Sequence, residues 1–136
     1  MVEKLIELMK SQEKHLVQLL ELFEIQKDLI MKKDAFALEG LVDKLNECSK
    51  KIAREEVARR NLLNNGSLKE FVYNAKNEEL SKTYAEVSEM VHKVMLQKDT
   101  NEMLIKQQIS LNAKVLQMMN PNREIKTYNS YGNLSK

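Results

Sequence analysis

A seam of apolar and uncharged side chains, spaced alternately four and three positions apart, runs through the beginning of the chain. This heptad spacing is typical of α-helices that pack side by side, because the seam positions then stay on one face of each helix. The beginning of the chain therefore predicts one long amphipathic helix that must bury this seam. Its members are Leu5, Met9, Gln12, Leu16, Leu19, Phe23, Gln26 and Ile30.

A short turn is expected after this helix. Lys32 and Lys33 suit the negative end of its dipole, and Asp34 is the expected N-cap of a second helix. The two helices are predicted at about 2–33 and 35–63. Because so few residues separate them, they are expected to be antiparallel neighbours.

The second helix has its own seam, which becomes polar toward its end. Glu55 and Arg59 are four positions apart there, and we expect them to form a local ion pair rather than a functional site. Cys48 is the only cysteine, so it forms no internal disulfide, and its seam position predicts a buried thiol. The seam consists of Leu38, Leu41, Leu45, Cys48, Ile52, Glu55, Arg59 and Leu62.

The end of the second helix and the start of a third are marked by small polar residues. Asn64, Asn65 and Gly66 should stop the second helix, with Gly66 in the left-handed C-cap conformation. The sequence SLKE, from Ser67 to Glu70, is a capping box. It predicts a short helix at about 68–75.

The short helix should close one end of a bundle, and the longest helix should follow it. Phe71 and Tyr73 are expected to cover the open end of the bundle. Asn77 is the expected cap of a helix at about 78–119, which stops before Pro121. The seam of this helix is apolar at Leu80, Tyr84, Val87, Val91 and Val94 and then includes the polar residues Gln97, Asn101 and Gln108.

These segments predict an all-α fold: an antiparallel helical bundle or coiled-coil hairpin with a long C-terminal helix. We expect 1–119 to be the bundle domain and 120–136 to be a flexible tail, because the tail contains turn-forming residues and no helical period. Composition agrees, since 31% of the residues are charged and 5% are aromatic, with three glycines and one proline. That profile suits long amphipathic helices rather than a β-sandwich or an α/β enzyme.

The predicted lengths of the helices do not match. At 1.5 Å per residue the first two helices would each be about 45 Å long and the last about 60 Å. The final ten or so residues of the last helix are therefore expected to project past the turn of the hairpin. Exposed apolar surface of this kind usually marks an interaction site. The apolar residues concerned are Ile109, Leu111, Val115, Leu116, Met118 and Met119.

Charge and hydropathy argue against two classes of partner. The formal net charge is +2, and no helix has a large face of one sign, so nucleic-acid binding is not expected. The mildly basic tail is too weakly charged to anchor a membrane. The longest uninterrupted apolar run is AFAL, so we expect neither a signal peptide nor a membrane span, and a cytoplasmic location is the default.

A catalytic or cofactor-binding reading has little support. Glu89 and His92 have the Glu-x-x-His spacing of di-iron bundles, but a second such pair is needed and Gln12 precedes His15. A histidine phosphotransfer bundle is a more serious alternative, because it is also built from amphipathic helices. Neither histidine is followed by the lysine–glycine pair of that family, and we predict no enzyme, no cofactor and no metal site.

Several stretches resemble the FlgN family of flagellar export chaperones. LIMKKDAFALEGLVDK is similar to the family's first helix–turn–helix, EEVARR to the end of its second helix, and NEMLIKQQISLNAKVLQMM to its long last helix. The tail has the family's tyrosine followed shortly by glycine, in the form Y-[DN]-x-x-G. The residues that carry the resemblance are Leu29, Asp34, Leu38, Leu41, Glu55, Arg59, Arg60, Tyr128, Asn129 and Gly132.

The resemblance implies a cytoplasmic type III export chaperone for the hook–filament junction proteins FlgK and FlgL. Such a protein binds the C-terminal helical regions of its clients, keeps them unassembled and delivers them to the export gate protein FlhA. Tyr128, or alternatively Tyr131, would contact FlhA. The expected client-binding residues are Leu104, Ile105, Gln108, Leu111, Val115, Met118 and Met119.

A structural coiled-coil protein that dimerises through its last helix is the rival interpretation. This interpretation needs the same surplus of apolar residues on that helix, but it assigns no function to the tail. A homo-oligomer of the free chain is therefore left open by the sequence.

Overall fold

The computed structural model describes residues 1–119, and this part of the chain contains four α-helices and no strand. The all-α prediction is confirmed. The expected helix bounds hold to within two residues, since the first two helices were expected to end at 33 and 63. Residues 120–136, on which the prediction of a flexible tail rests, lie outside the described part. The helices are α1 (Val2–Met31), α2 (Ala35–Leu62), α3 (Leu68–Ala75) and α4 (Glu78–Met119).

The chain divides into two compact units, Met1–Glu102 and Met103–Lys136. The first unit contains α1, α2, α3 and the beginning of α4. The described part of the second unit is the remainder of α4, at 103–119. The division into a bundle at 1–119 and a tail at 120–136 stays a prediction.

Side-chain oxygens cap the first turns of α2, α3 and α4, as the sequence predicts. Each oxygen accepts a hydrogen bond from the backbone N–H three residues later, which has no partner within its own helix. The capping residues are Asp34, Ser67 and Asn77, with donor–acceptor distances of 3.0, 3.2 and 3.0 Å. Local chemistry thus defines where three of the helices begin.

The loop between α2 and α3 turns at two asparagines rather than at its glycine. Asn64 and Asn65 have φ values of 52° and 62°, whereas Gly66 is outside the left-handed region. The expectation of a left-handed Gly66 was wrong, because asparagine tolerates that conformation through local hydrogen bonding. Gly66 is needed for a close approach instead: a Cβ atom there would lie 3.0 Å from the carbonyl oxygen of Leu63.

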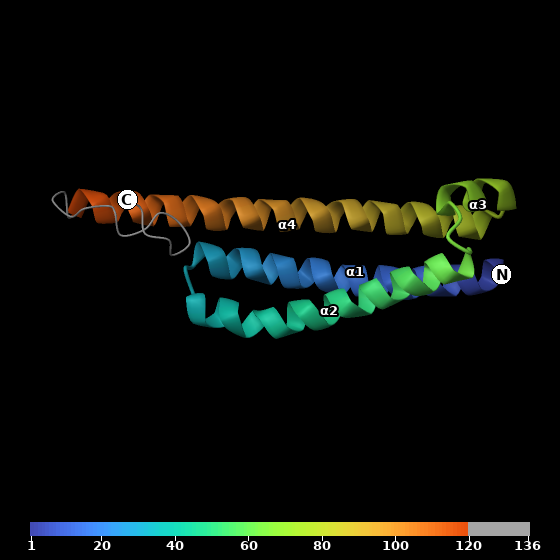
Figure 1. Ribbon diagram of the computed structural model, residues 1–136, viewed down its shortest axis with the longest axis horizontal. Coiled ribbons are helices and arrows are strands. Elements are labelled where there is room, and N and C mark those ends of the chain that lie inside the picture. The colour runs from blue at the N-terminus through green and yellow to red at the C-terminus, as the bar shows by residue number, and fades with distance from the viewer. Residues whose placement is uncertain (120–136) are drawn as a thin grey trace. The chain divides into compact units, whose positions relative to one another are not determined.

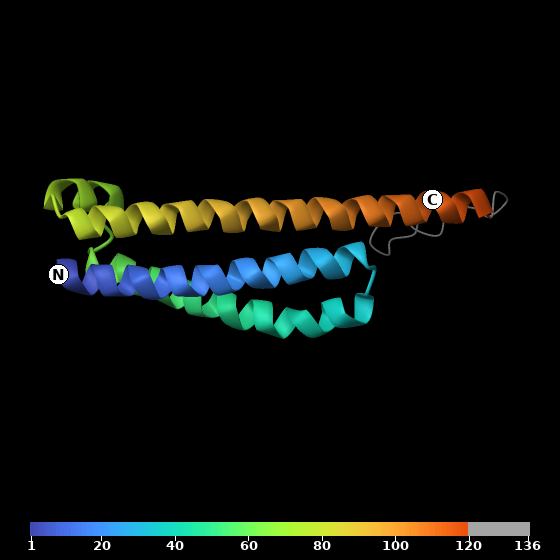
Figure 2. The same ribbon diagram turned by 180° about the vertical axis from the view of Figure 1, so that it is seen from behind.

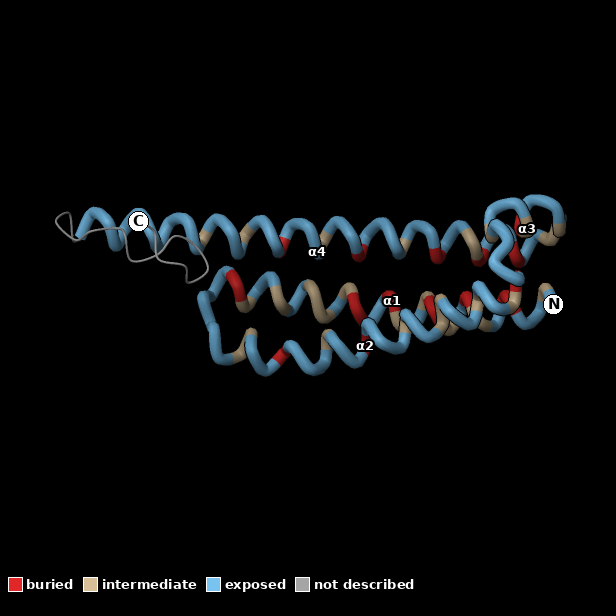
Figure 3. Tube along the Cα trace, viewed as in Figure 1, coloured by how far each residue is buried: buried red, intermediate tan, exposed pale blue. Residues whose placement is uncertain are grey.

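Within the first unit, α1 and α2 form an antiparallel hairpin. The beginning of α4 runs along α1 (Figure 1), as the Lys10–Glu79 ion pair and the Asn101–Phe23 hydrogen bond show. The core lies where the three seams meet, and the buried positions in Figure 3 mark these inner faces. Every predicted seam position of α1 and α2 is buried or half-buried, including the polar ones. The buried core cluster consists of Leu5, Ile6, Met9, Leu16, Leu19, Cys48, Leu63, Val72, Leu80, Val87 and Val94.

Helix α3 lies at the end of this unit where α1 begins (Figure 2). Val72 is buried, and Phe71 is half-buried against the core, as expected for a residue that closes the bundle. Tyr73 is 79% exposed, so its predicted role in closing the end was wrong. On a helix of 3.6 residues per turn, Tyr73 faces away from the side that holds Leu68, Val72 and Ala75.

Candidate functional site

From Leu104 onward α4 exposes a nearly continuous set of large apolar side chains. We call this set, together with the two half-buried residues among them, the distal face. Leu104 and Gln108 are half-buried, and the others are exposed, up to 79% at Met118. Figure 3 shows no buried position in this part of the helix. The distal face consists of Leu104, Ile105, Gln108, Ile109, Leu111, Val115, Leu116, Met118 and Met119.

The distal face continues the seam by which α4 packs in the first unit. The alternation of three and four positions is unbroken from the buried part into the exposed part, so the seam positions stay on one side of the helix. Burial ends abruptly, because Asn101 is 1% exposed and no residue of 102–119 is buried. Val91, expected in this seam, is 37% exposed, and Met90 packs against the core in its place, so that expectation was wrong. The seam positions are Val87, Met90, Val94, Gln97, Asn101, Leu104, Gln108, Leu111, Val115 and Met118.

A polar network occupies the last buried position of this seam. Asn101 Nδ2 donates to the carbonyl oxygen of Phe23 and to Oε1 of Gln26, each over 2.8 Å. Gln97 Nε2 donates to Asn101 Oδ1 over 3.0 Å. The buried amide is therefore satisfied by α1 and by its own helix, and it needs no external partner.

A second polar cluster lies between α1 and α2, and it corrects one prediction. Glu55 does not pair with Arg59: its Oε2 atom accepts from Ser11 Oγ and lies 2.8 Å from His15 Nδ1. Arg59 pairs instead with Glu56, three positions away. The two acidic neighbours on α2 thus have separate partners, and Glu55 bonds across the hairpin.

The geometry of this cluster does not suit nucleophilic catalysis. A catalytic triad needs the histidine between the hydroxyl and the acid, so that the ring can take the hydroxyl proton. Here Glu55 lies between Ser11 and His15 and accepts from both. Its second oxygen, Oε1, is buried without a hydrogen-bond partner among residues 1–119. The cluster therefore joins two helices and offers no activated nucleophile.

The carboxyl of Glu56 is held in its charged form. Burial raises its pKa, but the hydrogen bond and charge of Arg59 outweigh burial, with help from Gln12 and Arg60, so the pKa is lowered overall. Gln12 Nε2 lies 3.4 Å from Glu56 Oε1. This group links a buried seam position of α1 to the polar end of the α2 seam.

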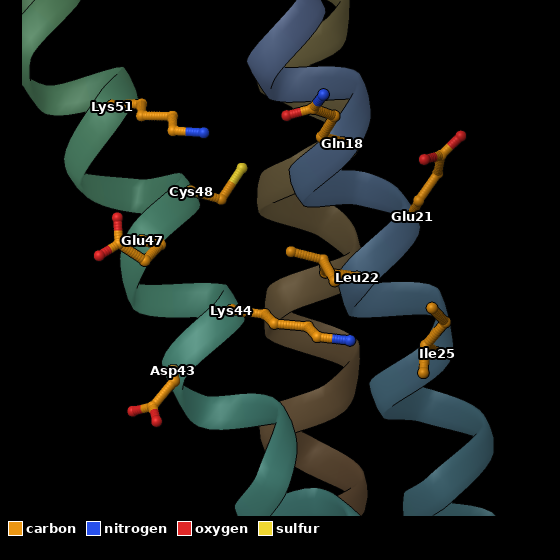
Figure 4. Close-up of a pocket in the computed structure, with 9 residues that line it drawn as sticks. All are labelled: Gln18, Glu21, Leu22, Ile25, Asp43, Lys44, Glu47, Cys48 and Lys51. Carbon is orange, nitrogen blue, oxygen red and sulfur yellow. The ribbon is translucent and has the colours of Figure 1, made fainter.

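A groove of about 450 Å³ lies between α1 and α2 on the surface of the hairpin (Figure 4). Leu22 and Ile25 of α1 and Cys48 of α2 supply its apolar lining, and Lys44 extends from α2 across the opening toward α1. Its charged residues have both signs, so it has no preference for an anion or a cation. Nothing in its chemistry selects a ligand.

The thiol of Cys48 at this groove is 6% exposed, as predicted for a core residue. Its Sγ atom donates to the backbone carbonyl of His15 over 3.3 Å. Burial raises the pKa of the thiol, with Lys51 opposing and Glu55 reinforcing this effect. Because the thiolate is the nucleophile, this cysteine is poorly reactive in the folded chain.

The remaining candidate residues are the two histidines and the two tyrosines of the tail. His92 is exposed, and His15 is half-buried beside Glu55. Among residues 1–119 no three histidine, cysteine or acidic side chains gather where they could hold a metal ion. No helix in that range is long and apolar enough to span a membrane. Tyr128 and Tyr131, the predicted gate-binding residues, lie outside the described residues.

Comparison with known proteins gives one match. The family described as FlgN protein matches residues 1–136, which is the whole chain. No curated protein and no solved structure matches the chain. The family match covers the distal face, the hairpin and the tail alike.

Proposed function

The chain belongs to the FlgN family of flagellar export chaperones, and we propose that it binds the hook–filament junction proteins FlgK and FlgL in the cytoplasm. In this role it keeps the C-terminal helical regions of its clients from assembling and delivers them to the export gate protein FlhA. The family acts by binding rather than by catalysis.

The distal face of α4 is the observation that carries this proposal. Leu111, Leu116 and Met118 are 55%, 59% and 79% exposed, although side chains of this size are normally buried. A helix that presents an apolar face can bind the apolar face of an amphipathic client helix. Met118 and Met119 add adaptable contacts, which suit a chaperone that accepts two clients.

Binding would prevent assembly of the client because the distal face covers the client's apolar seam. Regions that form coiled coils assemble through their own apolar seams. A client seam that lies on the distal face is shielded from other client molecules. Release at the export gate would expose it again.

The tail is proposed to act in a separate step, through Tyr128 and the export gate. A tyrosine supplies a large apolar ring and a hydroxyl at little cost in conformational entropy, which suits an anchor in a pocket. The support for this step is the family's tail pattern at Tyr128, Asn129 and Gly132. Tyr131 is the alternative anchor.

A double substitution tests the client-binding site. Leu111→Asp with Val115→Asp should abolish binding of FlgK and FlgL, because it places two carboxylates on the apolar face. Ser110→Asp with Gln117→Asp is the matched control, since it adds the same charge to the opposite side of the helix. Circular dichroism should show unchanged helicity in both variants. Unchanged affinity of the first variant in a pull-down would refute the proposed site.

A single substitution tests the division of labour. Tyr128→Ala should keep client affinity and lose binding to FlhA, measured with the chaperone loaded with client. Tyr131→Ala is the control for a general effect of removing a tail ring. The proposal would be wrong if Tyr128→Ala lost the client and kept the gate.

A further inference from the structure

The apolar surface of the distal face is wider than a single helix–helix seam. At about 100° per residue, its apolar side chains cover an arc of about 180°, whereas a core-facing stripe is typically about 100° wide. Val115 lies near the middle of the arc. On one flank, which we call the Leu111 side, are Leu104, Leu111 and Met118. On the other flank, the Leu116 side, are Ile105, Ile109 and Leu116.

Both flanks are exposed. Leu111 and Met118 are 55% and 79% exposed on one side, and Ile109 and Leu116 are 63% and 59% exposed on the other. One partner helix centred on either flank would leave the opposite flank in water. The apolar area is therefore larger than one helix can cover.

The first part of α4 provides an internal comparison. There α1 packs along the α4 seam, and two charged residues are among those that continue the Leu116 side. Lys98 precedes Leu116 by eighteen residues, or about five turns, and therefore has the same orientation. Glu102 precedes Ile109 by one heptad, and both charged residues are exposed. Val91 precedes Ile109 by eighteen residues and is 37% exposed, so this flank has both apolar and charged residues where α1 packs on α4. On the distal face the same flank carries no charge.

The charges of this segment indicate the chemistry of the partner. Residues 103–119 contain Lys106 and Lys114 and no aspartate or glutamate. In helical projection Lys106 lies just beyond the Leu116 side and Lys114 just beyond the Leu111 side. Each flank is thus bordered by one positive charge, which favours a partner with carboxylates along its outer edge.

The same charges disfavour two other occupants. Pairing the distal faces of two copies would gather four lysines without any carboxylate, which is unfavourable. For a lipid surface, each lysine contributes only about 1 kcal/mol. Asn112 lies close to the middle of the apolar arc and would have to enter the acyl region, where an amide is costly. A partner helix can supply a hydrogen bond to that amide.

We propose that the distal face binds two amphipathic helices at once, one on the Leu111 side and one on the Leu116 side. Each helix carries carboxylates along the edge that faces Lys114 or Lys106. Residues 103–119 then form the central helix of a three-helix assembly in which both flanks are buried. This inference rests on the proposed chaperone function and adds the number and the charge of the client helices.

Stoichiometry tests the inference with the full-length chain. The probe is a synthetic single-helix peptide from the C-terminal helical region of FlgK, counted by native mass spectrometry and by titration calorimetry. The wild-type chain should bind two peptides. Leu111→Asp with Met118→Asp should leave one peptide bound, and Ile109→Asp with Leu116→Asp should also leave one. Ser110→Asp with Gln117→Asp, on the opposite side, should still bind two.

The outcomes separate this inference from the function on which it rests. One peptide per wild-type chain would overturn the two-helix inference and leave the client-binding function intact. No peptide bound to the wild-type chain would overturn both. A dimer of the free chain that either flank variant dissociates would identify a second copy as the occupant and overturn the inference. Preferential binding of the chain to phosphatidylserine vesicles, lost in the same variants, would do so as well.

Discussion

The side-chain amide of Asn101 donates a hydrogen bond to the backbone carbonyl of Phe23, so a fully buried polar residue joins α4 to α1. The same amide group also bonds Gln26, which leaves it fully satisfied. A buried polar group that is satisfied in only one arrangement fixes the register of two helices. Asn101 is also the last buried residue of α4 in the described chain.

We predict that Asn101→Ala lowers the free energy of unfolding by about 1–3 kcal/mol, because Gln26 and Gln97 lose a buried hydrogen-bond partner. Urea denaturation monitored by circular dichroism measures this change. Asn112→Ala is the control, since Asn112 is exposed on the same helix and its loss should cost less than about 0.5 kcal/mol. Equal effects of the two substitutions would contradict a structural role for the Asn101 network.

Glu56 should make stability depend on acid pH. Its pKa is lowered in the folded chain, so it stabilises the fold above its ordinary value of about 4.5, and this contribution is lost as pH falls through the folded pKa. The contribution is expected to be less than about 1 kcal/mol, because the carboxylate is partly exposed and screened by solvent. Glu56→Gln should therefore be less stable than wild type at pH 7, and the difference should shrink as the pH falls below about 4.5.

Denaturation midpoints measured across this pH range provide the test. Glu24→Gln is the control, because Glu24 is exposed on α1 and forms no described ion pair. A stability difference between wild type and Glu56→Gln that stays constant from pH 7 to pH 3 would show that Arg59 does not act through the charge of Glu56.

The Cys48 thiol should be protected from alkylation in the native chain. Its burial limits access and raises its pKa, so the folded chain should react with iodoacetamide at pH 8 at least about tenfold more slowly than the chain in urea. Mass spectrometry of quenched samples gives the rates. Ala53→Cys in a Cys48→Ala background is the control, since residue 53 of α2 is exposed and should react quickly in both conditions. Similar rates for native and denatured Cys48 would contradict its burial.

Features that depend on neighbouring residues in the chain could be predicted from the sequence, and features that depend on a second helix could not. The caps at Asp34, Ser67 and Asn77 involve groups three residues apart, so their partners were evident. The partner of Glu55 was not, because Arg59 lies within reach along the helix while Ser11 and His15 are 44 and 40 residues away in sequence. Only the position of α1 decides between them.

The sequence by itself determined the four helices and the apolar surplus of the last one, because heptad spacing and helix capping depend on residues only a few positions apart in the chain. The seam of α4 is equally regular before and after Asn101, so spacing could not show where burial ends. The tertiary structure decided this, since burial requires a facing helix and α1 provides one for Asn101 through Phe23 and Gln26. Beyond Asn101 the same pattern remains exposed, and this exposure makes the distal face available to a partner.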